Sequence, residues 1–218
     1  MEWDWNVVAS VTPSLLKGLI VTVQATIVGA VLAYVLGLVI AILKMSGNKA
    51  VAFITYWSSE FIRRTPLLVQ LYFLFYVLPD FGIFLSPFVA GVIGLGLHFS
   101  TYTSEVYRAG IENVPKGQWE AARSLNYSAY HTWRFVILPQ AIPPMFPPLA
   151  NYLITMFKEK PLLSAITVVE LFNAANIYSN SHYKYLEPMT LVGLFFLLVS
   201  IPAAMIALKI ENKYKPLN

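Results

Sequence analysis

The stretch from Gly18 to Leu43, GLIVTVQATIVGAVLAYVLGLVIAIL, contains no charged residue. A membrane-spanning helix needs about 20 mostly apolar residues to cross roughly 30 Å of hydrocarbon, so this run alone is long enough to span a bilayer. It is too long to be a signal peptide, and it lacks a flanking small-residue cleavage site. The stretch therefore predicts a membrane protein built from helices.

The composition of the whole chain agrees with this interpretation. The 218 residues are 57% apolar and only 12% charged, whereas roughly a quarter of the residues in soluble domains are charged. A chain of this size cannot bury so much apolar surface inside itself, so most of that surface must face lipid or other subunits. The net charge is +4, but no basic stripe indicates nucleic-acid binding. The absence of cysteine excludes disulfides and Cys-ligated metals.

Four further segments complete the predicted membrane domain. Three charge-free runs have spanning length: 81–104, 135–157 and 188–208. The run Thr65 to Pro79 reaches that length only by extending back through Glu60, Arg63 and Arg64. Pro161 to Val169 is apolar but too short to cross, so we expect a re-entrant helix there. The predicted fold is all-α, with five transmembrane helices and this re-entrant helix.

The distribution of Lys and Arg predicts the orientation, because short basic loops stay in the cytoplasm. The basic segments are the loop with Lys44 and Lys49, the segment 105–134, and the C-terminal tail. We therefore expect the N-terminus outside and the C-terminus inside. Residues 1–14, with Trp3 and Trp5, form the predicted interfacial segment. Residues 15–209 form the membrane domain, and residues 210–218 form a cytosolic tail.

The predicted cytosolic loop, residues 110–136, contains two short helices. The stretch 117–139 reads GQWEAARSLNYSAYHTWRFVILP, is amphipathic at its start, and breaks near Asn126. Asparagine is the non-glycine residue that best tolerates a left-handed backbone, so we expect a tight turn there. A second helical piece should follow over 128–134. The small residues Ala121 and Ala122 permit close approach, which predicts a compact knob that docks into a partner.

Glu120-Ala121-Ala122, followed at an interval by Ile137-Leu138-Pro139, resembles the EAA loop of bacterial ABC importer permeases. In that family the loop docks into a groove on a cytosolic ATPase and transmits its closure to the membrane helices. Asn126 stands at the position of the usual glycine. The resemblance implies a coupling role for Gly117, Glu120, Ala121, Ala122, Leu125 and Asn126. It also implies that a bulky residue at Ala122 would block docking without preventing membrane insertion.

Further motifs are similar to those of permeases for polar amino acids such as histidine, glutamine and arginine: RTPLLVQ at 64–70, Glu105 with Tyr107-Arg108, VPKGQ at 114–118, LPQ at 138–140, and Asn151. FKEKPLLSAITVVEL at 157–171, YLEPMTLVG and SIPAA look most like ectoine and hydroxyectoine importers. The resemblance implies a multi-pass permease subunit of a bacterial inner membrane. Its implied partners are cytosolic ATPases that bind ATP and Mg, a second permease subunit, an external solute-binding protein and a small polar solute. No cofactor or enzymatic activity is expected on this chain.

Polar residues of the solute path are expected among Arg64, Thr65, Glu105, Asn151, Lys158 and Glu159. A lone charge at mid-bilayer costs about 2.5–3.5 kcal/mol, so Lys158 and Glu159 should be paired or lie in a wet cavity. Simpler alternatives remain: an interfacial salt bridge at 158–159, snorkelling of Arg63 and Arg64, and an ordinary helical Glu105–Arg108 pair. The three histidines lack metal-ligand spacing, so no metal site is predicted.

Two rival classes predict different features. A secondary transporter or channel acting without an ATPase would need intramembrane ionisable relays or an inverted repeat, and an intramembrane enzyme would need a clustered catalytic pair. None of these features is evident in the sequence. A phosphate-binding loop is also missing, so we expect ATP to be bound by another chain.

Overall fold

The computed structural model describes residues 3–214, and its regular secondary structure in that range is entirely helical. Two helices are each long and apolar enough to cross a membrane: α1 (Trp5–Lys44) and the part of α10 (Leu186–Tyr214) that ends at Lys209. Two bent helix pairs also qualify if each counts as one span. The predicted all-α membrane class is confirmed, while the count of five spans and the orientation stay predictions. Residues 215–218 of the predicted tail, and residues 1–2, lie outside the described range.

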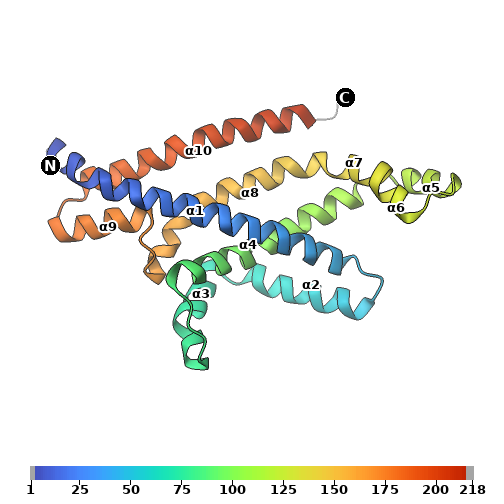
Figure 1. Cartoon of the computed structure of the whole chain (residues 1–218), viewed down its shortest axis with the longest axis horizontal. Coiled ribbons are helices and arrows are strands. Elements are labelled where there is room, and N and C mark those ends of the chain that lie inside the picture. Colours follow the sequence, from blue (N-terminus) through green and yellow to red (C-terminus); the bar gives the residue numbers. More distant parts are fainter. Residues whose placement is uncertain (1–2, 215–218) are drawn as a thin grey trace.

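The long helices run along one direction of the molecule (Figure 1). At one end lie the loop after α1 and a knob that contains α5 (Lys116–Ser124) and α6 (Ala129–His131). At the other end lie the N-terminus and α9 (Leu171–His182). The loop and the knob both carry basic segments predicted to be cytosolic, so the fold brings these segments to one end. We call it the knob end.

The most extensive packing joins α1 to α4 (Pro87–Glu112), and small residues make it possible. A Cβ atom added at Gly37 would meet the Thr103 side chain and lie 3.0 Å from the Ser100 carbonyl oxygen. The Thr103 hydroxyl donates a hydrogen bond to the Ala33 carbonyl at 2.9 Å. Such bonds and close backbone approach replace the hydrophobic driving force that lipid does not supply between helices.

The expected second span is not one helix. α2 (Lys49–Arg64) and α3 (Leu67–Tyr72) are separated by a break, and the helical axis bends by 99° across it. Pro66 has no N–H to donate and restricts the residue before it, so Thr65 is extended, with φ −90° and ψ 132°. After α3 the chain continues as a π-helix (Phe73–Val77) and a 3-10 helix (Leu78–Phe81). The next expected span, 81–104, is shifted, because α4 begins only at Pro87.

The expected fourth span, 135–157, is also interrupted. It consists of a π-helix (Thr132–Ile137), α7 (Leu138–Ala141), a 3-10 turn (Pro143–Met145) and α8 (Phe146–Lys158). Five prolines between positions 139 and 148 remove backbone donors from this stretch, which explains the irregular hydrogen bonding.

The segment predicted to be re-entrant, 161–169, forms a 3-10 helix (Lys160–Ile166) that ends at Thr167 in the left-handed conformation. The chain then enters α9 after a 57° bend. The sequence reasoning did not anticipate α9. The N-terminus of α9 packs on α1, where the Leu171 N–H donates to the Thr22 hydroxyl at 3.1 Å and Gly18 leaves room for the Glu170 carbonyl. The boundary predicted at residue 14 lies inside α1.

Candidate coupling and translocation sites

The knob is held together by a helix-ending turn at Asn126. This residue has φ 55°, in the left-handed region. The Tyr127 N–H donates to the Ala122 carbonyl at 3.0 Å, and the Asn126 N–H donates to the Arg123 carbonyl at 2.9 Å. These two bonds form a Schellman motif that terminates α5. α6 then begins after Ser128, whose side chain accepts the His131 N–H. The predicted left-handed turn is confirmed.

The inside of the knob is apolar. Trp119 of α5 meets Trp133 edge to face, with ring centroids 5.2 Å apart. Ala122 is only 2% exposed. The expectation that a bulky residue at Ala122 would act directly on docking therefore needs correction, because this side chain faces the knob interior. A larger residue there would first displace the knob's own packing.

The outer surface of the knob presents other residues of the same motif. Glu120 and Ala121 are exposed, and Gly117 has open space around its Cα. Leu125 is 67% exposed and Tyr130 is 69% exposed. The exposed surface of the knob thus includes one carboxylate and two large side chains with apolar area, which a protein partner could cover.

The break between α2 and α3 is stabilised by Gln70. Its side-chain amide donates to the Ile62 carbonyl at 2.7 Å and to the Thr65 carbonyl at 3.0 Å. These carbonyls lie at the end of α2, where the Ile62 carbonyl accepts only the Thr65 N–H at 3.3 Å because Pro66 has no N–H to offer, so Gln70 adds side-chain donors at the broken end of the helix. The same amide lies 3.1 Å from Nδ1 of His98 on α4. His98 is buried and thus lies against the break.

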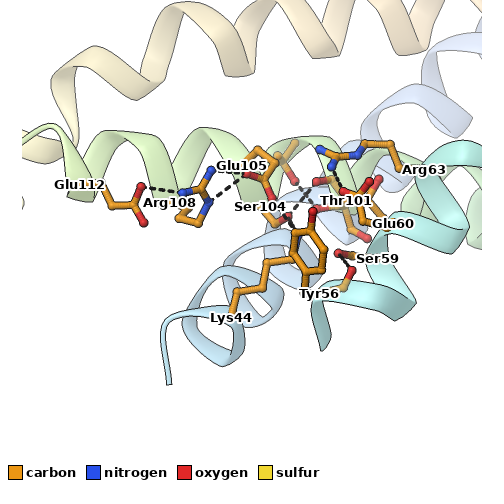
Figure 2. Close-up of polar contacts among 12 residues, drawn as sticks. Lys44, Tyr56, Ser59, Glu60, Arg63, Thr101, Ser104, Glu105, Arg108 and Glu112 are labelled. Carbon is orange, nitrogen blue, oxygen red and sulfur yellow. Dashed lines mark hydrogen bonds and ion pairs between the residues drawn. The ribbon is translucent and has the colours of Figure 1, made fainter. Parts of the chain in front are cut away.

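A polar cavity of about 580 Å³ lies at the knob end between α1, α2 and α4. Lys44 Nζ binds Glu105 at 2.8 Å, and Arg108 binds the other Glu105 oxygen through Nε and Nη2 at 2.9 and 2.7 Å. Arg108 also binds Glu112 at 2.5 Å (Figure 2). The helical Glu105–Arg108 pair considered as an alternative is therefore present. The cavity is lined by Lys44, Ala52, Phe53, Tyr56, Arg63, Glu105, Arg108 and Glu112.

Arg63 and Arg64 differ in their surroundings. Both bind Glu60, which is 4% exposed, and the Arg64 Nε lies 3.0 Å from its carboxylate. Arg63 lines the cavity, whereas the Arg64 side chain is 78% exposed and does not. The sequence reasoning selected Arg64 for the solute path. The sequence could have indicated Arg63 instead. It lies three residues after Glu60 and seven after Tyr56, so all three share the inner face of α2.

The other predicted path residues are dispersed: Thr65 lies at the break after α2, Asn151 lies inside α8, and Lys158 and Glu159 lie at the C-terminal end of α8. Lys158 is exposed, Glu159 is half-buried, and no ion pair joins either of them to another residue in the range 3–214. Of the three consecutive charged residues 158–160, Lys160 is the one that is fully buried, and its Nζ donates to the Met156 carbonyl at 2.8 Å. Asn151 is exposed. Within the described chain, no hydrogen bond or ion pair connects Arg64, Thr65, Glu105, Asn151, Lys158 and Glu159 with one another. The described residues also hold no group of three metal-ligating side chains.

Long apolar helices, bent helix pairs and a polar cavity at one end are features of a membrane transport subunit. Residues 33–215 match the family described as "Binding-protein-dependent transport system inner membrane component". The chain belongs to this family.

The chain is similar to amino-acid ABC transporter permeases. A probable amino-acid ABC transporter permease of Sinorhizobium fredii is 47% identical over 195 residues, covering 89% of this chain and 84% of that protein. The arginine transport system permease ArtQ of Bacillus subtilis is 31% identical and covers 99% of both chains. A solved amino acid ABC transporter with histidines is 35% identical, with a TM-score of 0.91 over 98% of this chain and 100% of that chain.

Proposed function

We propose that this chain is the permease subunit of an ATP-driven importer for a polar amino acid. It works with separate cytosolic ATPases, a second permease subunit and an external solute-binding protein. The observation that carries the proposal is the knob, because the EAA-like residues fold into a compact helical unit whose exposed face includes Glu120, Ala121 and Leu125. The names of the relatives support amino acids as the solute class.

The knob can transmit force because it is continuous with two membrane segments. α4 leads into α5, and the π-helix after α6 leads into α7 and α8. A cluster of Val114, Ile137, Ala141 and Met145 packs the base of the knob. Closure of the ATPases would move the knob, and the membrane helices would then alternate between outward and inward access. This chain performs no covalent step in that cycle.

Copurification tests the coupling role. Leu125→Glu places a charge on the exposed apolar face of the knob without touching its interior, so it should reduce recovery of the ATPase with the tagged permease. Lys209→Gln, an exposed change on α10, serves as the control. Equal ATPase recovery with Leu125→Glu and wild type would refute the docking face, and ATP-independent uptake would favour the secondary-transporter alternative.

An uptake assay tests which solute is carried and which residues line its path. Labelled glutamine, histidine and arginine should be taken up, with ectoine and hydroxyectoine as competitors, because the 157–171 motif resembles ectoine importers. Inhibition by the amino acids alone would exclude an ectoine permease. If Lys158 and Glu159 contact solute, Lys158→Met and Glu159→Gln should abolish uptake while ATPase assembly stays intact. Lys184→Gln, in the exposed segment before α10, is the matched control.

A further inference from the structure

A second cavity lies between α1 and α9, at the end of the molecule away from the knob (Figure 1). Its volume is about 210 Å³, and it includes none of the residues expected along the solute path. Val169 and Ile177, which are 50% and 49% exposed, leave it open to the outside of the chain. Its wall has two polar residues, Ser14 and Lys17, and is otherwise apolar: Gly18, Val21, Val169, Ala174 and Ile177.

Lys17 marks the edge of the hydrocarbon on this side of the molecule. Lys17 and Lys44 are the only charged residues within α1, and the charge-free run 18–43 lies between them. At 1.5 Å per residue they are roughly 40 Å apart along the helix, which is close to the thickness of a bilayer with its headgroups, about 40–45 Å. Since Lys44 lies at the knob end, Lys17 lies at the headgroup level of the opposite leaflet. The apolar wall at Gly18 and Val21 then extends from there toward the hydrocarbon.

The ammonium group of Lys17 is available to a ligand. Its exposed side chain makes no ion pair, hydrogen bond or ring contact with the part of the chain that the structure describes. No carboxylate lines the cavity. The Ser14 hydroxyl already donates to the Val11 carbonyl at 2.7 Å, so its proton is in use. The cavity therefore combines one cation without a counter-ion with an apolar crevice.

This combination is complementary to a phospholipid, which carries an anionic phosphate above an apolar chain. An apolar cavity of about 150 Å³ is large enough to hold benzene, so this crevice accommodates a segment of an acyl chain. The chain gains little by leaving the bilayer, because lipid tails are as apolar as the crevice. Preference for the site must therefore come from the headgroup. An ethanolamine headgroup brings an ammonium that no carboxylate on the wall would receive, whereas a glycerol headgroup leaves the phosphate charge free for Lys17.

We infer that this cavity binds an anionic phospholipid of the leaflet opposite the knob, with its phosphate on Lys17 and one acyl chain along Val21 and Ile177. The lipid bridges α1 and α9, which otherwise meet closely at Gly18 and the backbone of residues 170–171. It thereby adds to the contact that positions α9. The inference concerns the lipid surroundings of the fold and holds whichever solute is transported.

The test uses the complete transporter, purified in detergent and stripped of lipid. Native mass spectrometry counts the lipids that bind when dioleoylphosphatidylglycerol or dioleoylphosphatidylcholine is added. We expect the wild type to bind phosphatidylglycerol in preference to phosphatidylcholine. Lys17→Gln should weaken the binding of one phosphatidylglycerol per permease chain roughly fivefold or more, since it removes the cation that faces the headgroup. Lys184→Gln is the matched control, because it removes a charge near the same end without lining the cavity, and it should bind as the wild type does.

Two further variants separate charge, folding and shape. Lys17→Arg keeps the cation and should retain the lipid even if Lys17→Gln disturbs folding. Ile177→Trp fills the crevice from its exposed rim and should exclude the lipid although Lys17 remains. Retention of the lipid by Ile177→Trp would place it outside the crevice and reject the inference. Equal phosphatidylglycerol binding by wild type and Lys17→Gln would overturn it too, as expected if Lys17 only extends into bulk headgroups. Displacement of the lipid by inorganic phosphate would assign Lys17 to a soluble anion and overturn the lipid assignment.

Discussion

Replacement of Gly37 by alanine tests the contact between α1 and α4. The new methyl group would overlap the Thr103 side chain and lie 3.0 Å from the Ser100 carbonyl. Overpacking of this kind costs about 1–3 kcal/mol, and displacing the Thr103 hydroxyl from the Ala33 carbonyl costs about 0.5–1.5 kcal/mol. The clash should therefore destabilise the protein by about 1.5–4.5 kcal/mol.

Gly193→Ala is the matched control, because Gly193 also lies inside a long helix but has nothing within 4 Å of an added Cβ. Both variants gain the same helix propensity, so the difference between them isolates the clash. At roughly 2–4 °C per kcal/mol for a chain of this size, Gly37→Ala should melt on the order of 5–15 °C below Gly193→Ala. Thermal unfolding of the detergent-purified proteins measures this difference. Equal melting temperatures would show that the two helices are not in this close contact.

Three other predictions concern the knob, the contact between α1 and α9, and the topology. Ala122→Trp should lower the melting temperature of the permease as well as ATPase recovery, because Ala122 is buried; a loss of recovery with unchanged melting would contradict the packing shown here. Gly18→Val should push α9 away from α1, seen as faster proteolysis after α9, since the Glu170 carbonyl lies 2.9 Å from the added Cβ. Cysteines at Gly47 and Lys116 should react only with reagent on the cytosolic side and one at Asp80 only outside; labelling of Lys116 from outside would reject the topology.

The sequence carried enough information for the class of fold and for the turn in the knob. Charge-free runs report burial in lipid directly, and Asn126 tolerates the left-handed backbone that the turn requires. The break after Thr65 was also within reach, because proline disfavours a helical residue before it. Helix α9 could not be predicted, because Asn, Ser and His residues interrupt any apolar periodicity in its sequence. Its position depends on the tertiary contact with Thr22.

The candidate site was less predictable, because sequence spacing does not show which charges share a cavity. Glu105 was selected for its position in a membrane helix, but Lys44, its partner across the cavity, is 61 residues away in the chain. Lys160 resembles its charged neighbours in sequence, yet it alone among the three residues 158–160 is fully buried. Such distinctions arise from the packing of distant helices.

The seam of small residues between α1 and α4 has a mechanical consequence. Side chains and backbone that interlock at such short range cannot slide past one another gradually, so these two helices should move as a single stiff lever during transport. Bending must then occur where the helical ladder is already interrupted, at Thr65-Pro66 and along the prolines between residues 139 and 148. The second of these interruptions connects the knob to α8. If the knob docks on an ATPase as proposed, its movement would shift α8 relative to the rigid pair formed by α1 and α4.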